Sequence, residues 1–177
     1  MKIITAFLAL FFLIPNLSYA DSHEHKHIPT NLELMDETGT KRSFADLTGE
    51  NGLVLVFHRS AQWCPFCKMQ LIDMNAQRAM IEDKGYNIAA ISYDSVEDLK
   101  KFDSRYKVNF PLLSDEGSKT IKAFGIFNEE HEEGSRAYGV PHPTIFVISA
   151  DKIVKSSIAE EGYRKRPSVE AVLELIE

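Results

Sequence analysis

The 177-residue sequence is poor in cysteine and has no excess of positive charge. Cys64 and Cys67 are its only cysteines, and two residues separate them. With a formal net charge of −6 and no basic stripe, the chain lacks the features of a nucleic-acid-binding protein. It also lacks internal repeats and low-complexity segments. Its 44% hydrophobic and 26% charged residues are typical of an ordinary globular domain.

Residues 1–20 differ from the rest of the chain. A basic start precedes an almost wholly apolar run over residues 3–17, and small residues lead up to Ala20. This layout is typical of a secretory signal peptide cleaved after Ala20, and the run is shorter than the roughly 20 residues of a membrane span. We therefore expect an exported protein, periplasmic or secreted and without a stable membrane anchor. It would have a His-rich flexible leader over residues 21–28 and one domain over residues 29–177.

The leader suggests one metal-binding hypothesis. After cleavage the chain would begin Asp21-Ser22-His23. Its free amine, two backbone amides and the imidazole of His23 would present four nitrogens, a set that suits copper(II) or nickel(II). The alternative is a polar leader that binds no metal. The sequence predicts no other cofactor.

The Cys64–Cys67 pair has three interpretations. As a structural disulfide it would stabilise little, because it closes a very short loop and the benefit grows with loop length. As a zinc site it would need four ligands, and the nearest histidine, His58, has no matching partner at metal-ligand spacing. Redox chemistry is therefore the favoured interpretation, and export would place the pair where disulfides persist.

Apolar runs and helical spacing predict an alternation of strands and helices. The predicted strands cover residues 53–58, 87–93, 110–113, 144–149 and 153–158, after a small hairpin around residues 32–39. The predicted helices cover residues 64–84, 96–106, 118–124 and 169–176. The first helix is expected to bury Met69, Ile72, Met74, Ala76, Ala79 and Met80. This order predicts an α/β fold with a mixed central β-sheet and helices on both faces. A CxxC pair between a buried strand and the following helix is typical of the thioredoxin-like fold.

The predicted position of the pair, between a buried strand and the next helix, explains its chemistry. A helix N-terminus stabilises an anion, so the pKa of the Cys64 thiol should fall and leave Cys67 to resolve a mixed disulfide. Pro65 suits the first turn of a helix. Trp63 would either form an apolar shoulder beside Cys64 or pack into the core. Further along, His142 is a second candidate, either near the thiols or in an exposed loop.

Two stretches resemble a known family. Residues 59–71, RSAQWCPFCKMQL, are similar to the W-C-P-F-C segment of peroxiredoxin-like members of the thioredoxin-fold redoxin group, which includes the AhpC/TSA-type proteins. Residues 138–149, YGVPHPTIFVIS, are similar to the strand before their last helix. The resemblance covers nearly the whole mature chain. It implies thiol–disulfide or antioxidant peroxide chemistry centred on Cys64, with a cis-proline at Pro143.

The sequence departs from the peroxiredoxin motif P-x-x-x-[T/S]-x-x-C. Phe57 and Ala61 occupy the proline and Thr/Ser positions, and His142-Pro143 replaces the family's distant arginine. Arg59 is a candidate substitute, or else a solvated loop charge. Because disulfide exchange does not need these missing groups, we expect an exported thiol–disulfide oxidoreductase.

The expected partners are a protein or small-molecule disulfide or thiol and an external electron donor or acceptor. The alternatives are a thiol-dependent peroxidase and a non-catalytic binding or metal-handling module on the same scaffold.

Overall fold

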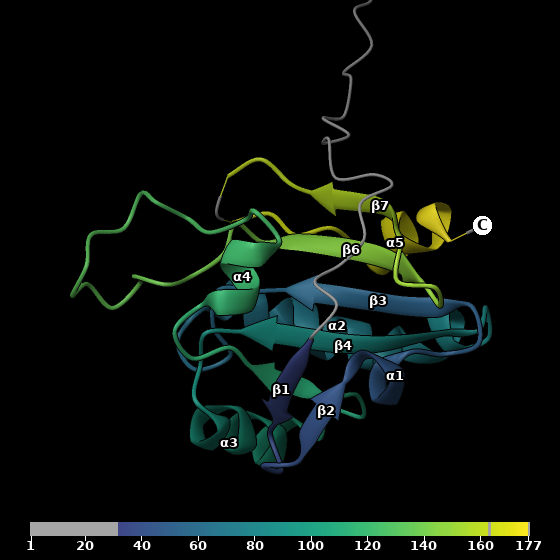
Figure 1. Ribbon diagram of the computed structural model, residues 1–177, viewed down its shortest axis with the longest axis horizontal. Helices are drawn as coiled ribbons and strands as arrows, with labels where there is room; N and C mark the ends of the chain where they lie inside the picture. The colour runs from purple at the N-terminus through teal and green to yellow at the C-terminus, as the bar shows by residue number, and fades with distance from the viewer. Residues whose placement is uncertain (1–31, 163, 177) are drawn as a thin grey trace, which may run out of the picture.

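The computed structural model describes residues 32–162 and 164–176 (Figure 1). The predicted signal peptide and the His-rich leader with His23 lie outside these residues. Within the described residues, no helix has the length and apolar character needed to cross a membrane.

Seven strands and five helices make up the described chain. The strands are β1 (Glu33–Asp36), β2 (Lys41–Ser43), β3 (Gly52–Phe57), β4 (Tyr86–Ser92), β5 (Leu112–Ser114), β6 (Thr144–Ser149) and β7 (Val154–Ala159). The helices are α1 (Phe44–Leu47), α2 (Pro65–Glu82), α3 (Val96–Tyr106), α4 (Lys119–Ala123) and α5 (Val169–Leu175). The sequence analysis predicted the larger elements to within a few residues and missed the single-turn helix α1.

The strands form one mixed sheet in the order β2-β1-β5-β4-β3-β6-β7. β3 and β4 pair in parallel, as do β4 and β5, whereas β6 pairs antiparallel with both β3 and β7. The central strand β3 is buried along its whole length, in agreement with its continuous apolar sequence. The prediction of a mixed central sheet is therefore confirmed.

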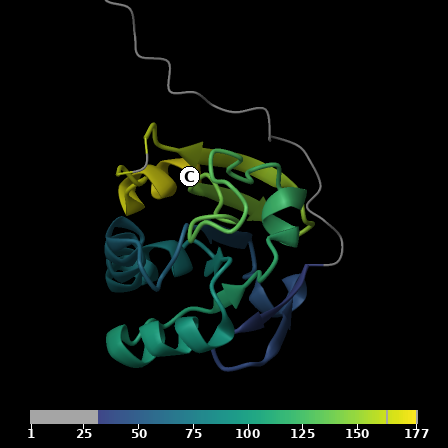
Figure 2. The same cartoon turned by 90° about the vertical axis from the view of Figure 1, so that its left-hand side faces the viewer.

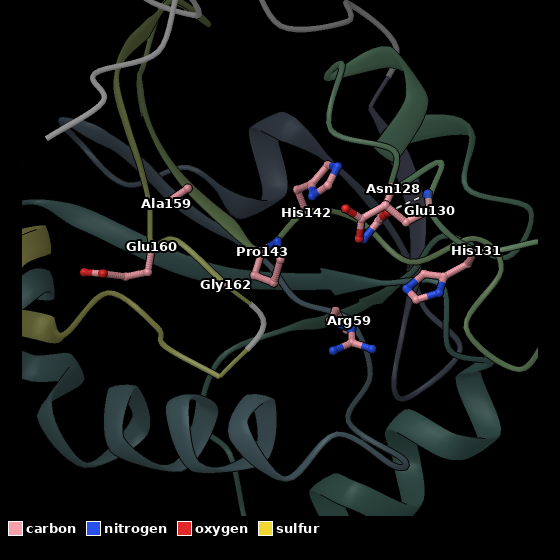
Figure 3. Close-up of a pocket in the computed structure, with 9 residues that line it drawn as sticks. All are labelled: Arg59, Asn128, Glu130, His131, His142, Pro143, Ala159, Glu160 and Gly162. Carbon is pink, nitrogen blue, oxygen red and sulfur yellow. Dashed lines mark hydrogen bonds between the residues drawn. The ribbon is translucent and has the colours of Figure 1, made fainter.

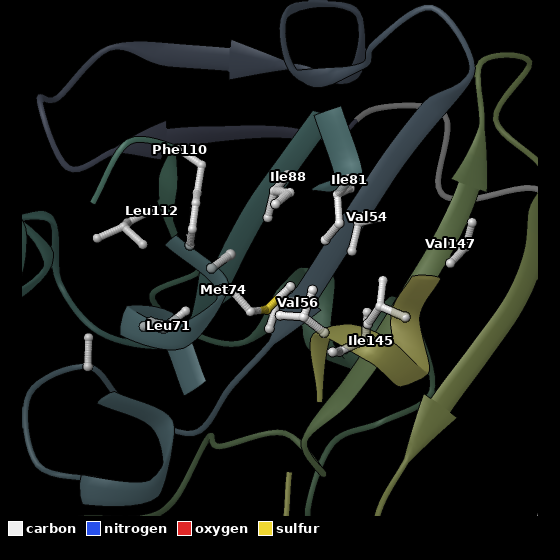
Figure 4. Close-up of a cluster of buried hydrophobic side chains, with 14 of the residues drawn as sticks. Val54, Val56, Leu71, Met74, Ile81, Ile88, Phe110, Leu112, Ile145 and Val147 are labelled. Carbon is white, nitrogen blue, oxygen red and sulfur yellow. The ribbon is translucent and has the colours of Figure 1, made fainter. Parts of the chain in front are cut away.

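Helices cover both faces of this sheet (Figures 1 and 2). One core cluster joins alternate residues of β3, β4 and β6 to side chains of α2, α3 and α5. The second joins the opposite faces of the same strands to α1 and α4. Figure 4 shows the first cluster, in which Leu71, Met74 and Ile81 of α2 meet strand residues such as Val56 and Ile145.

The predicted buried side of α2 is largely wrong. Met69, Ile72 and Met80 are 58%, 39% and 47% exposed, and Ala76 and Ala79 are also exposed. Of the predicted set only Met74 is buried; the other buried residues of α2 are Cys67, Gln70, Leu71 and Ile81. The helix carries apolar residues on two sides, and periodicity alone cannot tell which side meets a sheet.

The peptide bond before Pro143 is trans, as are all peptide bonds of the described residues. The cis-proline that the family resemblance implied is therefore wrong for this structure. The backbone next to Pro143 is held in place by a hydrogen bond, because the His142 amide donates to the carbonyl of Ile126 at 2.7 Å. A trans X–Pro bond is also the intrinsically favoured form, by about 0.5–1 kcal/mol.

Candidate active site

The two cysteines lie at the start of α2, where the sequence predicted them. Cys64 is the N-cap residue, Pro65 occupies the first turn, and Cys67 lies one turn into the helix. Both thiols are free, with exposures of only 1% and 0%. Their sulfur atoms are 2.8 Å apart and share a hydrogen bond. The local sequence thus produces a buried dithiol at a helix N-terminus, where backbone N–H groups favour negative charge.

One residue near the sulfurs was not foreseen. Arg166, from the segment before α5, places Nη2 at 3.4 Å from Cys67 Sγ and 3.8 Å from Cys64 Sγ. It lies about a hundred residues beyond the cysteines, in a short basic run, and no local sequence signal connects the two. The structure therefore supplies a cation at the dithiol from a distant segment.

The two thiols have opposite shifts in pKa. The hydrogen bond with Cys64 is the largest influence on Cys67 and lowers its pKa to about 3; His58 and Arg166 lower it further, while burial opposes the shift. The same hydrogen bond, followed by burial, raises the pKa of Cys64 above its ordinary value. The pair therefore holds one proton and one negative charge.

This corrects the prediction that the pKa of Cys64 falls. The helix N-terminus stabilises one thiolate for the pair, and the nearer approach of Arg166 favours placing it on Cys67. Cys64 then keeps the shared proton. The two sites titrate as a coupled unit rather than as independent thiols.

Replacing Arg166 with glutamine should raise the pKa of Cys67, because a cation beside a thiolate favours the charged form. We expect the midpoint of thiolate formation to move upward by about one to three pH units. Titration of the ultraviolet thiolate absorbance measures it. Lys165→Gln, at the exposed neighbouring position, is the matched control and should leave the midpoint in place. Equal midpoints in wild type and Arg166→Gln would contradict this role.

The loop before the cysteines is anchored by a buried aspartate, Asp94. Its carboxylate accepts hydrogen bonds from Ser60 Oγ (2.7 Å), the Ala61 amide (2.6 Å) and Ser92 Oγ (2.9 Å). The N-cap of α3 is the next residue, Ser95, so Asp94 does not cap that helix. Asp94 instead connects the end of β4 to the loop that leads into the cysteine pair.

Trp63 is half-buried, and two arginines lie near its ring. The Arg59 and Arg136 guanidinium carbons are 4.9 Å and 5.4 Å from its ring centroid. Its Nε1 donates to Tyr93 Oη at 2.9 Å, and that hydroxyl donates to the Arg136 carbonyl at 2.6 Å. The indole therefore connects the loop carrying Arg136 to the segment that leads into Cys64.

Arg59, His142 and Pro143 line one cavity of about 540 Å³, with Arg59 and Pro143 near the middle of the lining in Figure 3. The other residues lining it are Asn128, Glu130, His131, Ala159, Glu160 and Gly162. A cavity of this size fits a small ligand or the end of a peptide. Among the described residues, no group of three or more histidine, cysteine or acidic side chains is placed to hold a metal ion.

His58 directly follows β3 and is fully buried. The sequence analysis considered it only as a zinc ligand. In the structure it lies close enough to Cys67 to lower the pKa of that thiol. A histidine at the end of a fully buried apolar strand is the one sequence signal that would have drawn attention to it.

Comparison with known proteins identifies the family of this chain. The AhpC/TSA family matches residues 25–157. Peroxiredoxin Bcp of Escherichia coli K12 is 29% identical over 124 residues, covering 70% of this chain and 78% of the relative. A thiol-disulfide oxidoreductase ResA of Bacillus anthracis is 31% identical over 144 residues, covering 77% of this chain and 74% of the relative.

A putative peroxiredoxin of Mycobacterium tuberculosis is 32% identical over 121 residues, covering 68% of this chain and 76% of the relative. Among solved structures, peroxidoxin BcpB of the same organism superposes with a TM-score of 0.74 at 25% identity, covering 87% of this chain and 96% of the other. These relatives are redox enzymes by name, and the solved one has the same fold as this chain. The chain therefore belongs to the AhpC/TSA family.

Proposed function

We propose that this protein is an exported thiol–disulfide oxidoreductase in which Cys64 attacks the substrate and Cys67 resolves the intermediate. The observation that carries the proposal is the 2.8 Å contact between the two sulfurs at the start of α2. Such a pair has its resolving thiol in place before the substrate arrives. Cys64 is assigned as the attacking residue because it precedes the helix, next to the exposed Pro65, whereas Cys67 is enclosed within it.

The reaction transfers two electrons from the protein to a disulfide. As Cys64 Sγ attacks one substrate sulfur, its proton passes to the Cys67 thiolate, and the first substrate thiolate leaves and takes a proton from water. Cys67 then attacks Cys64 Sγ, which breaks the mixed disulfide and releases the second substrate thiolate, and the proton of Cys67 passes through water to that thiolate. The products are the Cys64–Cys67 disulfide and two substrate thiols. An external dithiol resets the protein by the reverse steps.

A thiol-dependent peroxidase is the second candidate. It is favoured by the names of several relatives and by Arg166, which supplies a cation at the sulfurs where the family's usual arginine is missing. Against it, Ala61 has no hydroxyl to stabilise the departing peroxide oxygen. Disulfide exchange requires neither group and is the better supported reaction.

The discriminating experiment compares two substrates on the reduced wild-type protein. We expect rapid reduction of a disulfide, and a peroxide rate constant at least about 100-fold below that of E. coli Bcp measured in parallel. A peroxide rate equal to that of Bcp would favour the peroxidase. Absence of both activities would favour a non-catalytic binding or metal-handling module. The reduction potential of the pair then tells whether the protein acts as a reductant or an oxidant.

Export is part of the proposal and rests on the signal-peptide pattern of residues 1–20. N-terminal sequencing of the protein recovered outside the cytoplasm should begin at Asp21. A protein recovered only inside the cell with Met1 retained would contradict it.

A further inference from the structure

The segment that leads into Cys64 lies among positively charged side chains, some of them from distant parts of the chain. The Arg59 and Arg136 guanidinium carbons are 4.9 Å and 5.4 Å from the ring centroid of Trp63, the residue directly before Cys64. Arg136 Nη2 also donates a hydrogen bond to Gln62 Oε1 at 3.2 Å. Both of these partners of Arg136 are uncharged, so the contacts hold its guanidinium in place without neutralising it.

Further cations lie near the same segment. Gln62 lines a small cavity of about 150 Å³ whose other lining residues include Lys68, Lys101 and Arg105, with Asp98 as the acidic side chain among them. The whole chain has a formal net charge of −6. Cations gathered around one segment of an acidic protein are therefore a local feature, and such a group attracts anions to the surface that it surrounds.

The carboxylates of this region are placed differently. Asp94 is buried, and its oxygens accept hydrogen bonds from the loop before the cysteines and from β4. Glu160 lines the larger cavity, but in Figure 3 its carboxylate points away from Arg59. Glu130 lines the same cavity beside Asn128, whose Oδ1 accepts a hydrogen bond from the Glu130 amide at 2.9 Å. Arg59 is the lining residue that belongs to the loop before the cysteines.

The larger cavity, of about 540 Å³, lies next to the dithiol. Arg59 connects it to the loop before Cys64, and Gly162 comes shortly before Arg166, whose Nη2 is 3.8 Å from Cys64 Sγ. A cavity of this size suits a small ligand. The planar guanidinium of an arginine matches a carboxylate, with which it forms paired, charge-assisted hydrogen bonds. An anionic small molecule bound at Arg59 would therefore lie beside the reacting sulfur.

We propose that the substrate is a low-molecular-weight disulfide that carries carboxylates close to its sulfur atoms. Arg59 and Arg136 bind the carboxylates and hold a substrate sulfur toward Cys64, and the surrounding cations raise the local concentration of the anion. This inference rests on the proposed function and names its substrate class. It assigns Arg59 and Arg136 to substrate specificity, whereas the exchange of electrons belongs to the two cysteines.

The test compares two chromogenic aromatic disulfides on the reduced protein. Dithiobis(nitrobenzoate) carries a carboxylate on each ring and dithiodipyridine carries none, so the ratio of their second-order rate constants reports recognition of the carboxylate. Arg59→Gln and Arg136→Gln should each lower this ratio about 10-fold, the usual scale for losing one hydrogen bond to a charged group. Added salt should lower the ratio in the wild type and change it less in the variants, because salt screens exposed charges.

Arg78→Gln is the matched control. It removes the same charge from α2 about 20 Å farther along the helix, where Arg78 pairs with Glu82, and should leave the ratio within about 2-fold of the wild type. Because Arg136 is exposed, Arg136→Gln decides the question if Arg59→Gln does not fold.

A ratio that is unchanged in the folded Arg59 and Arg136 variants, or that falls equally in Arg78→Gln, overturns the proposal. Failure of the proposed function looks different, because the wild type would then release no second equivalent of coloured thiol from either probe.

Discussion

Replacing Cys64 with serine should abolish disulfide exchange, with a loss on the order of 1,000-fold or more. A serine hydroxyl remains protonated at neutral pH and cannot displace a sulfur as a thiolate does. Steady-state reduction of a disulfide, started with the fully reduced variant, measures the loss. Trp63 should remain in place in this variant, since its hydrogen bond to Tyr93 does not involve the sulfur.

Cys67→Ser is the matched variant for the same experiment, and it should fail at a different step. Cys64 can still attack, so one equivalent of substrate thiolate is released and the other substrate half remains on the protein as a mass adduct. In the dithiol, Cys67 has the lower pKa. The reverse order, in which Cys67 attacks the substrate and Cys64 resolves the intermediate, therefore predicts a different outcome. Turnover or adduct formation retained in Cys64→Ser, but lost in Cys67→Ser, would assign the attack to Cys67.

Asp94→Ala should lower the free energy of unfolding by about 3 kcal/mol or more. The substitution removes the acceptor of Ser60 Oγ, the Ala61 amide and Ser92 Oγ, all in a buried region. Each buried donor left unpaired costs about 1–3 kcal/mol. Because the same loop leads into Cys64, disulfide exchange should fall as well. Urea-induced unfolding of the reduced protein measures the first effect.

Asp73→Ala is the control for this prediction. Asp73 is exposed on α2 and accepts one hydrogen bond from Gln77 one turn away, so its loss should cost no more than about 0.5 kcal/mol. Asp94→Asn should give an intermediate loss, because the amide retains one acceptor oxygen. An unfolding midpoint for Asp94→Ala equal to that of the wild type would show that the loop is anchored elsewhere.

The sequence was most informative where one residue's environment is set by its near neighbours in the chain. Apolar runs predicted the central strands. The position of the two cysteines between a buried strand and the next helix predicted a dithiol at the start of that helix. The sequence did not show which side of α2 is exposed, because Met69, Ile72 and Met80 have the same apolar character as the buried Met74. Which side meets the sheet is decided by the packing of the whole layer.

The sequence by itself determined that two cysteines stand at the N-terminus of a helix behind a buried strand, because strand and helix signals are local and need only a few residues. Only the tertiary structure decided which thiol carries the charge. Arg166, 99 residues from Cys67, and His58, directly after β3, lie close to that sulfur because of the fold. The pKa of a buried group depends on which groups are packed against it, and the spacing of residues in the sequence does not show which groups those are.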